Sequence, residues 1–249
     1  MIIAPLFFEN YDNNHCLQAS VLMCLESLGV STTFDKLDKS IGYDSRYWTW
    51  MISVAKVLQD KIHGVQLVSN LDYGELALNP KAYLKKRWGE NSQNYKSQEG
   101  HSPLDFLNIQ TAAKAFLKNG GAYRYCDQKP TEIELSDLLK AHLIIMWADW
   151  NALYNLTGQE VKGHFVVVFA ERDNVFIIHD PGLKPKPGKR VDKSLLLKAC
   201  SGEMLLIPKN TSPIGKIINK KDVCYCGSGV YFKKCHMKIL TKEGKTRFD

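Results

Sequence analysis

Two apolar segments separated by a short polar break constrain the fold more than any other feature of this sequence. Residues 163–170 read Gly-His-Phe-Val-Val-Val-Phe-Ala, and residues 174–180 read Asn-Val-Phe-Ile-Ile-His-Asp. Both are rich in β-branched and aromatic residues, which favour strands, and residues 171–173 between them suit a hairpin loop. The sequence therefore predicts two adjacent antiparallel strands. With a loop of three residues, Ala170 lies opposite Asn174.

This hairpin predicts a histidine beside a carboxylate. Counting back along both strands puts His164 opposite Asp180, with Cβ atoms about 5 Å apart. At this spacing the carboxylate can accept the imidazole N–H and fix its tautomer. His179 alternates to the other face of its strand, and residues 149–154 are placed to form a wall of the cleft. The pairing depends on the loop length, because a shift of one residue in the register would separate the two side chains.

The segment from Asn13 to Gly29 has the start, body and end of a helix. Asn13 or Asn14 is suited to cap the first turn, and Gly29 is suited to a left-handed exit. One face, predicted to be buried, has apolar residues at helical spacing: Leu17, Val21, Cys24, Leu25 and Leu28. Cys16 lies in the first turn, where unpaired amide N–H groups and the helix dipole stabilise a thiolate. We therefore expect Cys16 to be a nucleophile and Cys24 to be a small core residue.

Other segments complete a coarse outline of the domain. A polar segment rich in helix breakers, residues 85–103, predicts a long loop. Residues 136–141 predict a helix that leads into a strand over 143–147. Residues 181–190 predict a stiff basic loop beside the His164–Asp180 pair, suited to an acidic substrate or simply a solvated turn.

The C-terminal segment contains four potential metal ligands in a C-x-C-x8-C-H pattern: Cys224, Cys226, Cys235 and His236. Three thiolates and one imidazole complete a tetrahedral zinc site and leave no position open for substrate, so we expect one structural zinc ion. The alternatives are ordinary free or buried cysteines, or a disulfide between Cys224 and Cys226 that would close a strained ring.

The net charge of the chain lies in the same segment. Residues 209–249 contain ten Lys or Arg and three Asp or Glu, whereas residues 1–208 contain 23 of each sign, so the formal charge of +7 falls in this segment. We expect a domain over residues 1–208, a basic linker over 209–221 and a zinc module over 222–249. A basic zinc module suggests an acidic partner, which can be an acidic protein, the ribosome, nucleic acid or anionic lipid. A solvated charged linker is the alternative.

The composition also indicates the cellular compartment in which the protein resides. The N-terminal residues lack the basic region and the longer apolar run of a secretory signal, and no stretch approaches the ~18 apolar residues of a membrane span. The seven cysteines, three of them in the metal cluster, do not form a disulfide framework. We therefore expect a protein of the reducing cytoplasm without an integral membrane segment.

The combination of Cys16 at a helix start with the His164 and Asp180 strands resembles the papain-like cysteine peptidases. More narrowly, it resembles the bacterial group that removes double-glycine leader peptides from bacteriocins, over residues 8–208. The resemblance implies a papain-like α+β fold, in which an N-terminal helix bears the cysteine and an antiparallel sheet bears the histidine and aspartate. It implies that these residues are the nucleophile, the base and the residue that orients the base. Asn10, six residues before the cysteine, takes the place of the family's oxyanion-binding glutamine.

The C-terminal cluster resembles the SEC-C motif, a small zinc-binding module. The four ligands, the Gly-Ser-Gly segment after Cys226 and the Lys-Lys pair before Cys235 all match that motif. The resemblance implies that residues 222–249 bind zinc structurally and recruit a partner or substrate.

The chain departs from the peptidase pattern at two positions. Asn10 keeps an amide donor but is one methylene shorter than glutamine, and Leu17 replaces the glycine that usually follows the nucleophile. The sequence also has no counterpart of the membrane and ATPase domains of the exporters, so export-coupled leader removal is not expected. The leading expectation is a cysteine peptidase or amide hydrolase that acts on a protein or peptide. The alternatives are an acyl transferase on the same scaffold and a non-catalytic adaptor protein.

Overall fold

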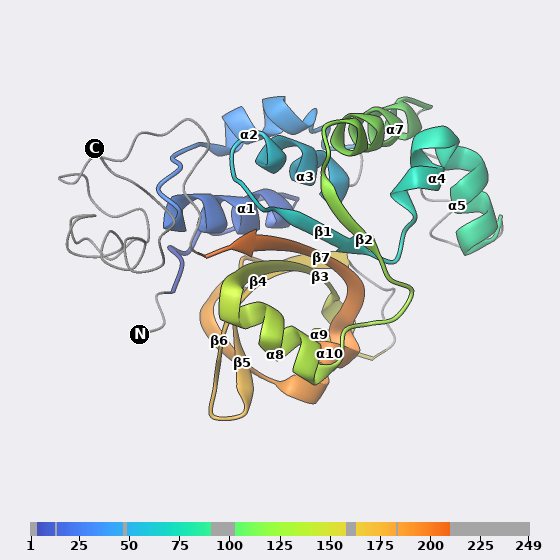
Figure 1. The fold of residues 1–249 in the computed structure, drawn as a ribbon. Coiled ribbons are helices and arrows are strands. Elements are labelled where there is room, and N and C mark those ends of the chain that lie inside the picture. The colour runs from blue at the N-terminus through green and yellow to red at the C-terminus, as the bar shows by residue number, and fades with distance from the viewer. Residues whose placement is uncertain are drawn as a thin grey trace, which may run out of the picture.

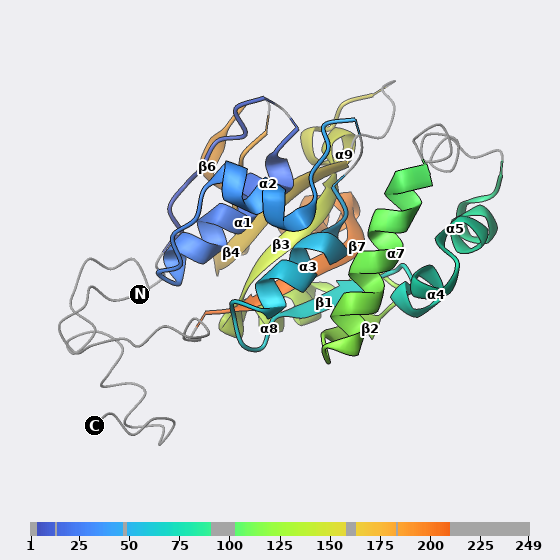
Figure 2. The same cartoon turned by 90° about the horizontal axis from the view of Figure 1, so that it is seen from above.

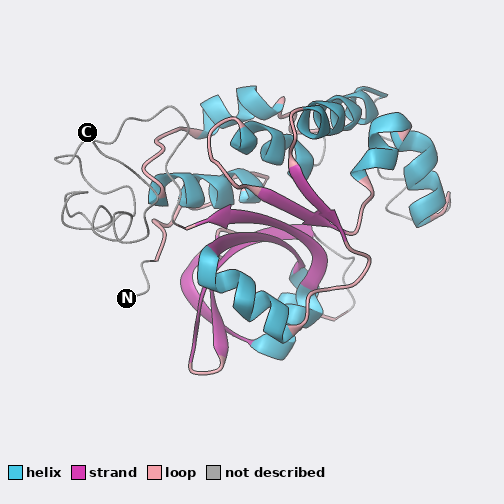
Figure 3. Ribbon diagram, in the orientation of Figure 1, coloured by secondary structure: helices cyan, strands magenta, loops and turns pink. Residues whose placement is uncertain are grey.

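The structure, a computed structural model, describes residues 4–12, 14–46, 49–90, 103–157, 163–182 and 184–209. Within these ranges the chain forms nine helices and seven strands, so the predicted α+β class is confirmed (Figure 3). In chain order the elements are α1 (Cys16–Ser27), α2 (Phe34–Ile41), α3 (Met51–Gln59), β1 (Gln66–Ser69), α4 (Tyr73–Leu78), α5 (Pro80–Trp88), α7 (Pro103–Lys118), β2 (Ala122–Tyr125), α8 (Glu132–Ala141), β3 (His142–Asp149), α9 (Trp150–Tyr154), β4 (Gly163–Arg172), β5 (Val175–Asp180), β6 (Lys186–Asp192), α10 (Lys193–Ala199) and β7 (Cys200–Pro208).

All seven strands belong to one sheet, in the order β2-β1-β7-β3-β4-β5-β6. β1 and β2 are parallel, and all other neighbours are antiparallel. The sheet is therefore mixed, whereas the sequence predicted an antiparallel one. The parallel pair arises because the chain passes through α4, α5 and α7 between β1 and β2, and parallel neighbours need such a crossover. β7, the last of these strands in the chain, lies in the interior of the sheet between β1 and β3.

The hairpin of β4 and β5 has a different register from the one predicted. Its turn has two residues, Asp173 and Asn174, with positive φ values of 50° and 61°, so the predicted three-residue loop is wrong. Two successive residues with positive φ are typical of a type I′ turn, whose twist matches that of the flanking strands. Because of this turn and a bulge in β4, His164 is not set opposite Asp180, which pairs instead with Lys186 on β6.

Helices cover both faces of the sheet (Figure 1). α1 packs against β4 and β3, and α3 packs beside α7 on the same side, as the view in Figure 2 also shows. On the other side the sheet curls around α8, and α10 packs against α8 and α9. The start of α1 therefore lies over the sheet on one side, while α9 continues directly from the end of β3.

β4 is buried on both faces, which explains its sequence. Val167 and Phe169 belong to the core cluster that includes α1, whereas Val166 and Val168 belong to the cluster that includes α8 and α10. All four side chains are buried. A strand covered on both faces reads as a continuous apolar run and not as an alternating one.

The helix predicted over residues 136–141 and the strand predicted over 143–147 are both confirmed, and both are longer than predicted. The helix, α8, begins earlier because Thr131 and Glu134 form a capping box at its first turn. The loop predicted over residues 85–103 is wrong at its start, where the first four residues belong to α5.

Candidate active site

Cys16 is the first residue of α1, as the sequence predicted, and its free thiol is partly exposed. The N-cap residue is His15, whose side chain makes no capping hydrogen bond. Asn14 is therefore not the cap, and Asn13, the other residue predicted for this role, lies outside the described residues. Gly29 follows the helix with φ 71°, the predicted left-handed exit. Cys16 thus lies beside the first N–H groups of a helix, which favour an anionic sulfur.

Asn10 holds the segment that leads into α1. Its side-chain Oδ1 accepts a hydrogen bond from the His15 backbone N–H at 2.9 Å. Its own backbone N–H donates to the carbonyl of Pro181 at 2.9 Å, so the start of α1 is tied to the residue that follows Asp180. Since Oδ1 is an acceptor here, the Nδ2 group is the donor that remains on this buried side chain.

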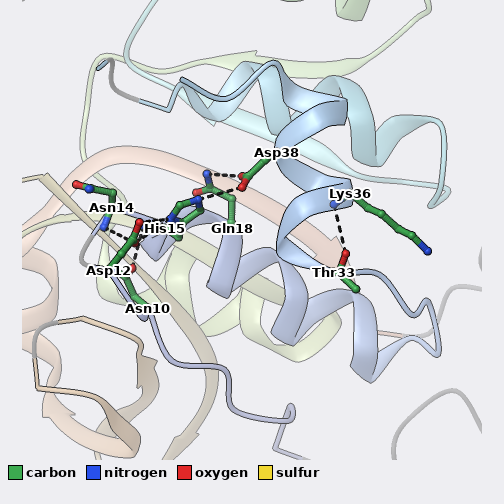
Figure 4. Close-up of polar contacts among 8 residues, drawn as sticks. All are labelled: Asn10, Asp12, Asn14, His15, Gln18, Thr33, Lys36 and Asp38. Carbon is green, nitrogen blue, oxygen red and sulfur yellow. Dashed lines mark hydrogen bonds and ion pairs between the residues drawn. The ribbon is translucent and has the colours of Figure 1, made fainter. Parts of the chain in front are cut away.

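His15 lies in a polar cluster that joins the start of α1 to α2 (Figure 4). Its Nδ1 is 2.8 Å from both carboxylate oxygens of Asp12, and its Nε2 is 3.0 Å from Oδ2 of Asp38. The Gln18 amide donates to the other oxygen of Asp38 at 3.1 Å. Each ring nitrogen of His15 thus has a carboxylate partner. The cluster therefore fixes the backbone immediately before Cys16.

His164 and Asp180 are in direct contact despite the altered register. Nε2 of His164 is 2.7 Å from Oδ1 of Asp180. The same oxygen accepts the Gly182 backbone N–H at 3.0 Å, and Oδ2 accepts the hydroxyl of Tyr154. Asp180 has no exposed surface. The pair predicted from the sequence thus lies together, through a contact between side chains that are not directly opposed.

The same ring also hydrogen-bonds the side chain of Cys16. Because Nε2 is bonded to Asp180, Nδ1 is the ring nitrogen left for the thiol. Burial alone would lower the pKa of His164, but the bonds to Asp180 and Cys16 outweigh it and raise the pKa from 6.5 to about 9. Burial likewise opposes ionisation of Asp180, yet its bonds to His164, Tyr154 and Gly182 hold its pKa below the ordinary value. The side chains of Cys16, His164 and Asp180 therefore interact one after the other.

Three residues that the sequence did not single out complete the surroundings of the pair. The Trp150 ring lies edge-on to the His164 ring, with centroids 4.8 Å apart. Tyr154 bonds Asp180 and packs on Trp150 with centroids 4.2 Å apart. A Cβ on Gly182 would lie 2.7 Å from the His164 ring, so this position has no room for a side chain. Trp150 and Tyr154 lie in the predicted cleft wall. Their aromatic side chains at i, i+4 spacing were the sequence signal that could have identified them.

The competing histidine and cysteine candidates have structural roles. His179 lies on the other face of β5, as predicted, and its ring nitrogens bond the Pro5 carbonyl and the Gly188 N–H. Burial lowers the pKa of His179, which favours the neutral ring. Cys24 is a buried core residue, as predicted, and burial raises the pKa of its thiol. Burial also raises the pKa of the Cys200 thiol.

The four predicted zinc ligands, Cys224, Cys226, Cys235 and His236, lie outside the described residues. Among the residues that are described, no group of three or more His, Cys, Asp or Glu is placed to hold a metal ion. No helix in the described part of the chain has both the length and the apolar character that crossing a bilayer needs.

In the comparisons with known proteins, no family model matches the sequence and no curated protein matches it. The site is therefore interpreted from its own geometry.

Proposed function

We propose that the protein is a cysteine peptidase or amide hydrolase that works through an acyl-enzyme on Cys16. The observation that carries this proposal is the buried His164–Asp180 pair, whose ring reaches the thiol at the start of α1. A nucleophile, a base and a residue that orients the base are the groups that such chemistry needs. These contacts support the roles that the resemblance to papain-like peptidases implies.

In the first half of the reaction, the sulfur of Cys16 attacks the carbonyl carbon of an amide. With a pKa of about 9, the His164 ring carries a proton at neutral pH, and this proton goes to the leaving amine. Asp180 keeps the ring in one orientation through the bond to Nε2. The amine leaves, and the acyl group stays on the sulfur as a thioester.

The negative oxygen of the tetrahedral intermediate needs donors near the start of α1. The backbone N–H of Cys16 is one such group, and the Nδ2 group of Asn10 is the other that we propose. Asn10 is buried and fixed at both its backbone and its Oδ1, so a short asparagine is held close to the helix start. These restraints offset the methylene that it lacks compared with glutamine.

In the second half, His164 takes a proton from water, and the resulting hydroxide attacks the thioester carbon and releases Cys16. An amine or a thiol in the place of water would make the same apparatus an acyl transferase. The C-terminal segment, with its four soft ligands, is proposed to bind structural zinc and to recruit a partner or substrate through its positive charge.

Alkylation of individual thiols tests the nucleophile. The full-length protein is treated with iodoacetamide at neutral pH, and each cysteine is followed by peptide mass spectrometry. We expect Cys16 to react about 100-fold faster than Cys126, a free and partly exposed thiol that serves as the internal reference. His164→Ala should remove this difference, whereas Cys126→Ala should leave the Cys16 rate unchanged.

The acyl-enzyme is tested separately with p-nitrophenyl acetate. A burst of p-nitrophenol together with an acetyl group on Cys16 is the expected result, and it should be absent in Cys16→Ala. If Cys16 reacts no faster than Cys126 and takes up no acetyl group, the hydrolase proposal fails and the non-catalytic adaptor is favoured.

A further inference from the structure

The bonds to Asp180 divide unequally between its two oxygens. Oδ1 accepts from both His164 and Gly182, whereas the hydroxyl of Tyr154 is the one donor to Oδ2 among the described residues. The carboxylate has no exposed surface, so a lost donor is not replaced directly by bulk water. The torsion that turns the plane of an aspartate carboxylate has broad preferences, so it does not by itself hold the group in one plane. The Tyr154 bond to one oxygen therefore helps to fix the plane of the carboxylate, in which the other oxygen faces the ring.

Tyr154 is itself fixed by the start of the short helix α9. Asp149, the last residue of β3, caps this helix by accepting the Asn151 N–H at 2.9 Å. The preceding residue of β3, Ala148, pairs with His164 in the sheet. Trp150 and Tyr154 are four residues apart, so they share one face of the helix, and they contact His164 and Asp180 respectively. One helical turn thus supports two adjacent members of the site.

Lys189 adds a charge to the Tyr154 ring. Its Nζ lies 3.6 Å from the ring centroid, and the Nζ of Lys186 lies 5.4 Å from it. β6 places both lysines next to β5, since Lys186 pairs with Asp180. The N–H of Gly188 bonds the buried ring of His179 at 3.0 Å, which anchors this part of the strand. A cation over an aromatic face draws electron density from the ring, and a phenol hydroxyl then donates more strongly.

We propose that Tyr154 is a positioning residue, whose hydroxyl holds Asp180 in the orientation that orders His164, and that Lys189 strengthens this bond from the ring face. The inference rests on the proposed function, because the orientation of His164 matters only if Cys16 is a nucleophile. Tyr154 touches no reacting atom in this scheme. It acts through Asp180.

The pH dependence of Asp180 distinguishes positioning from simple packing. In the wild type, the bonds to His164, Tyr154 and Gly182 outweigh burial and hold the pKa of Asp180 below its ordinary value, so the carboxylate is ionised at neutral pH. Tyr154→Phe keeps the ring but leaves Oδ2 buried without a donor, which favours the neutral acid. We expect the Asp180 pKa to rise by about one to two pH units. Lys189→Met removes a neighbouring positive charge and should move it in the same direction by less.

The experiment is a carbon NMR titration of the full-length protein with labelled aspartate side-chain carboxyls. The Asp180 signal is the one missing from Asp180→Asn. Tyr125→Phe is the matched control, because it removes an exposed tyrosine hydroxyl on β2 and should leave the Asp180 titration unchanged. The iodoacetamide rate of Cys16, measured in parallel, should fall on the acidic side at a higher pH in Tyr154→Phe than in the wild type.

An Asp180 titration that is the same in folded Tyr154→Phe and wild type would overturn the inference. Should Tyr154→Phe fail to fold, Lys189→Met provides the test, and an unshifted Asp180 pKa in that variant counts against the role of Lys189. The proposed function fails separately, if Cys16 of the wild type shows no enhanced reactivity. In that case a shifted Asp180 titration would still show the Tyr154 bond, while its catalytic purpose would be refuted.

Discussion

Substitution of Gly182 by alanine perturbs the site with a single methyl group. A Cβ at this position would lie 2.7 Å from Cε1 of His164, 2.8 Å from Nε2 and 2.7 Å from Cζ3 of Trp150. The three contacts are on two separate rings, so rotation of one side chain does not relieve all of them. The His164 ring must therefore move, or the segment after Asp180 must move away from it.

The size of the effect follows from these distances. Non-bonded carbon atoms pack at about 3.5 Å or more, so the ring or the backbone shifts by roughly 0.8 Å. A misplacement of about 1 Å at a catalytic group can cost ~100-fold in rate, and we expect a loss of this order in the alkylation rate of Cys16. Overpacking of this kind also destabilises a domain by about 1–3 kcal/mol. The variant should fold, and its Cys16 should be alkylated slowly.

The assay combines iodoacetamide kinetics at neutral pH with urea denaturation. Gly120→Ala is the control, because Gly120 has φ 71° and open space around its Cβ position, away from the site. This variant should lose roughly 1 kcal/mol through backbone strain and keep the wild-type rate at Cys16. A Gly182→Ala protein that is destabilised but reacts within about threefold of the wild type would refute the steric argument, since a shifted ring must slow the thiol.

Three further predictions concern pH, the helix start and zinc. Burial alone would lower the pKa of His164, but its bonds to Asp180 and Cys16 raise it to about 9. The contribution of His164 to stability is therefore complete below about pH 6.5 and is lost as the pH rises through 9. Urea denaturation should show a loss of about 3 kcal/mol over this range that His164→Gln lacks, and equal slopes would contradict it. Asp38→Asn weakens the His15 cluster and should lower the unfolding free energy by about 1–3 kcal/mol and slow Cys16 alkylation, whereas the exposed Asp60→Asn should do neither. Metal analysis of the full-length protein should find one zinc ion per chain, reduced in Cys224→Ser and retained in Cys16→Ala; an absence of zinc from the wild type would exclude the structural module.

The sequence was sufficient to predict the parts of the site whose signals are local. Cys16 could be placed at a helix start because an apolar period of 3.6 residues follows it. The strand of His164 was recognisable because β4 is covered on both faces and is apolar throughout. Asp180 was found because it ends the next apolar run, and its contact with His164 survives an error in the register. The side chains of the pair reach each other without being opposed.

The rest depended on contacts that no local pattern encodes. The register required the turn at Asp173 and Asn174 to be recognised as a two-residue turn, and the bulge in β4 has no clear sequence signal. The contact of His15 with Asp38 joins residues that are 23 positions apart in the chain. The parallel pair of β1 and β2 likewise depends on three intervening helices that meet only in the folded chain.

The interior position of β7 has a consequence for the nascent chain. β1 and β2 are made early and β3 to β6 late, and among the described residues the two groups of strands are joined in the sheet by β7, the last strand in chain order. Until residues 200–208 have left the ribosome, β1 and β3 both present open edges, which expose unpaired backbone groups. The helix of Cys16 packs on β4 and β3, so it is made well before the strands that cover it. Loss of β7 by premature termination would therefore leave β1 and β3 with unpaired edges, which are sites where chains aggregate.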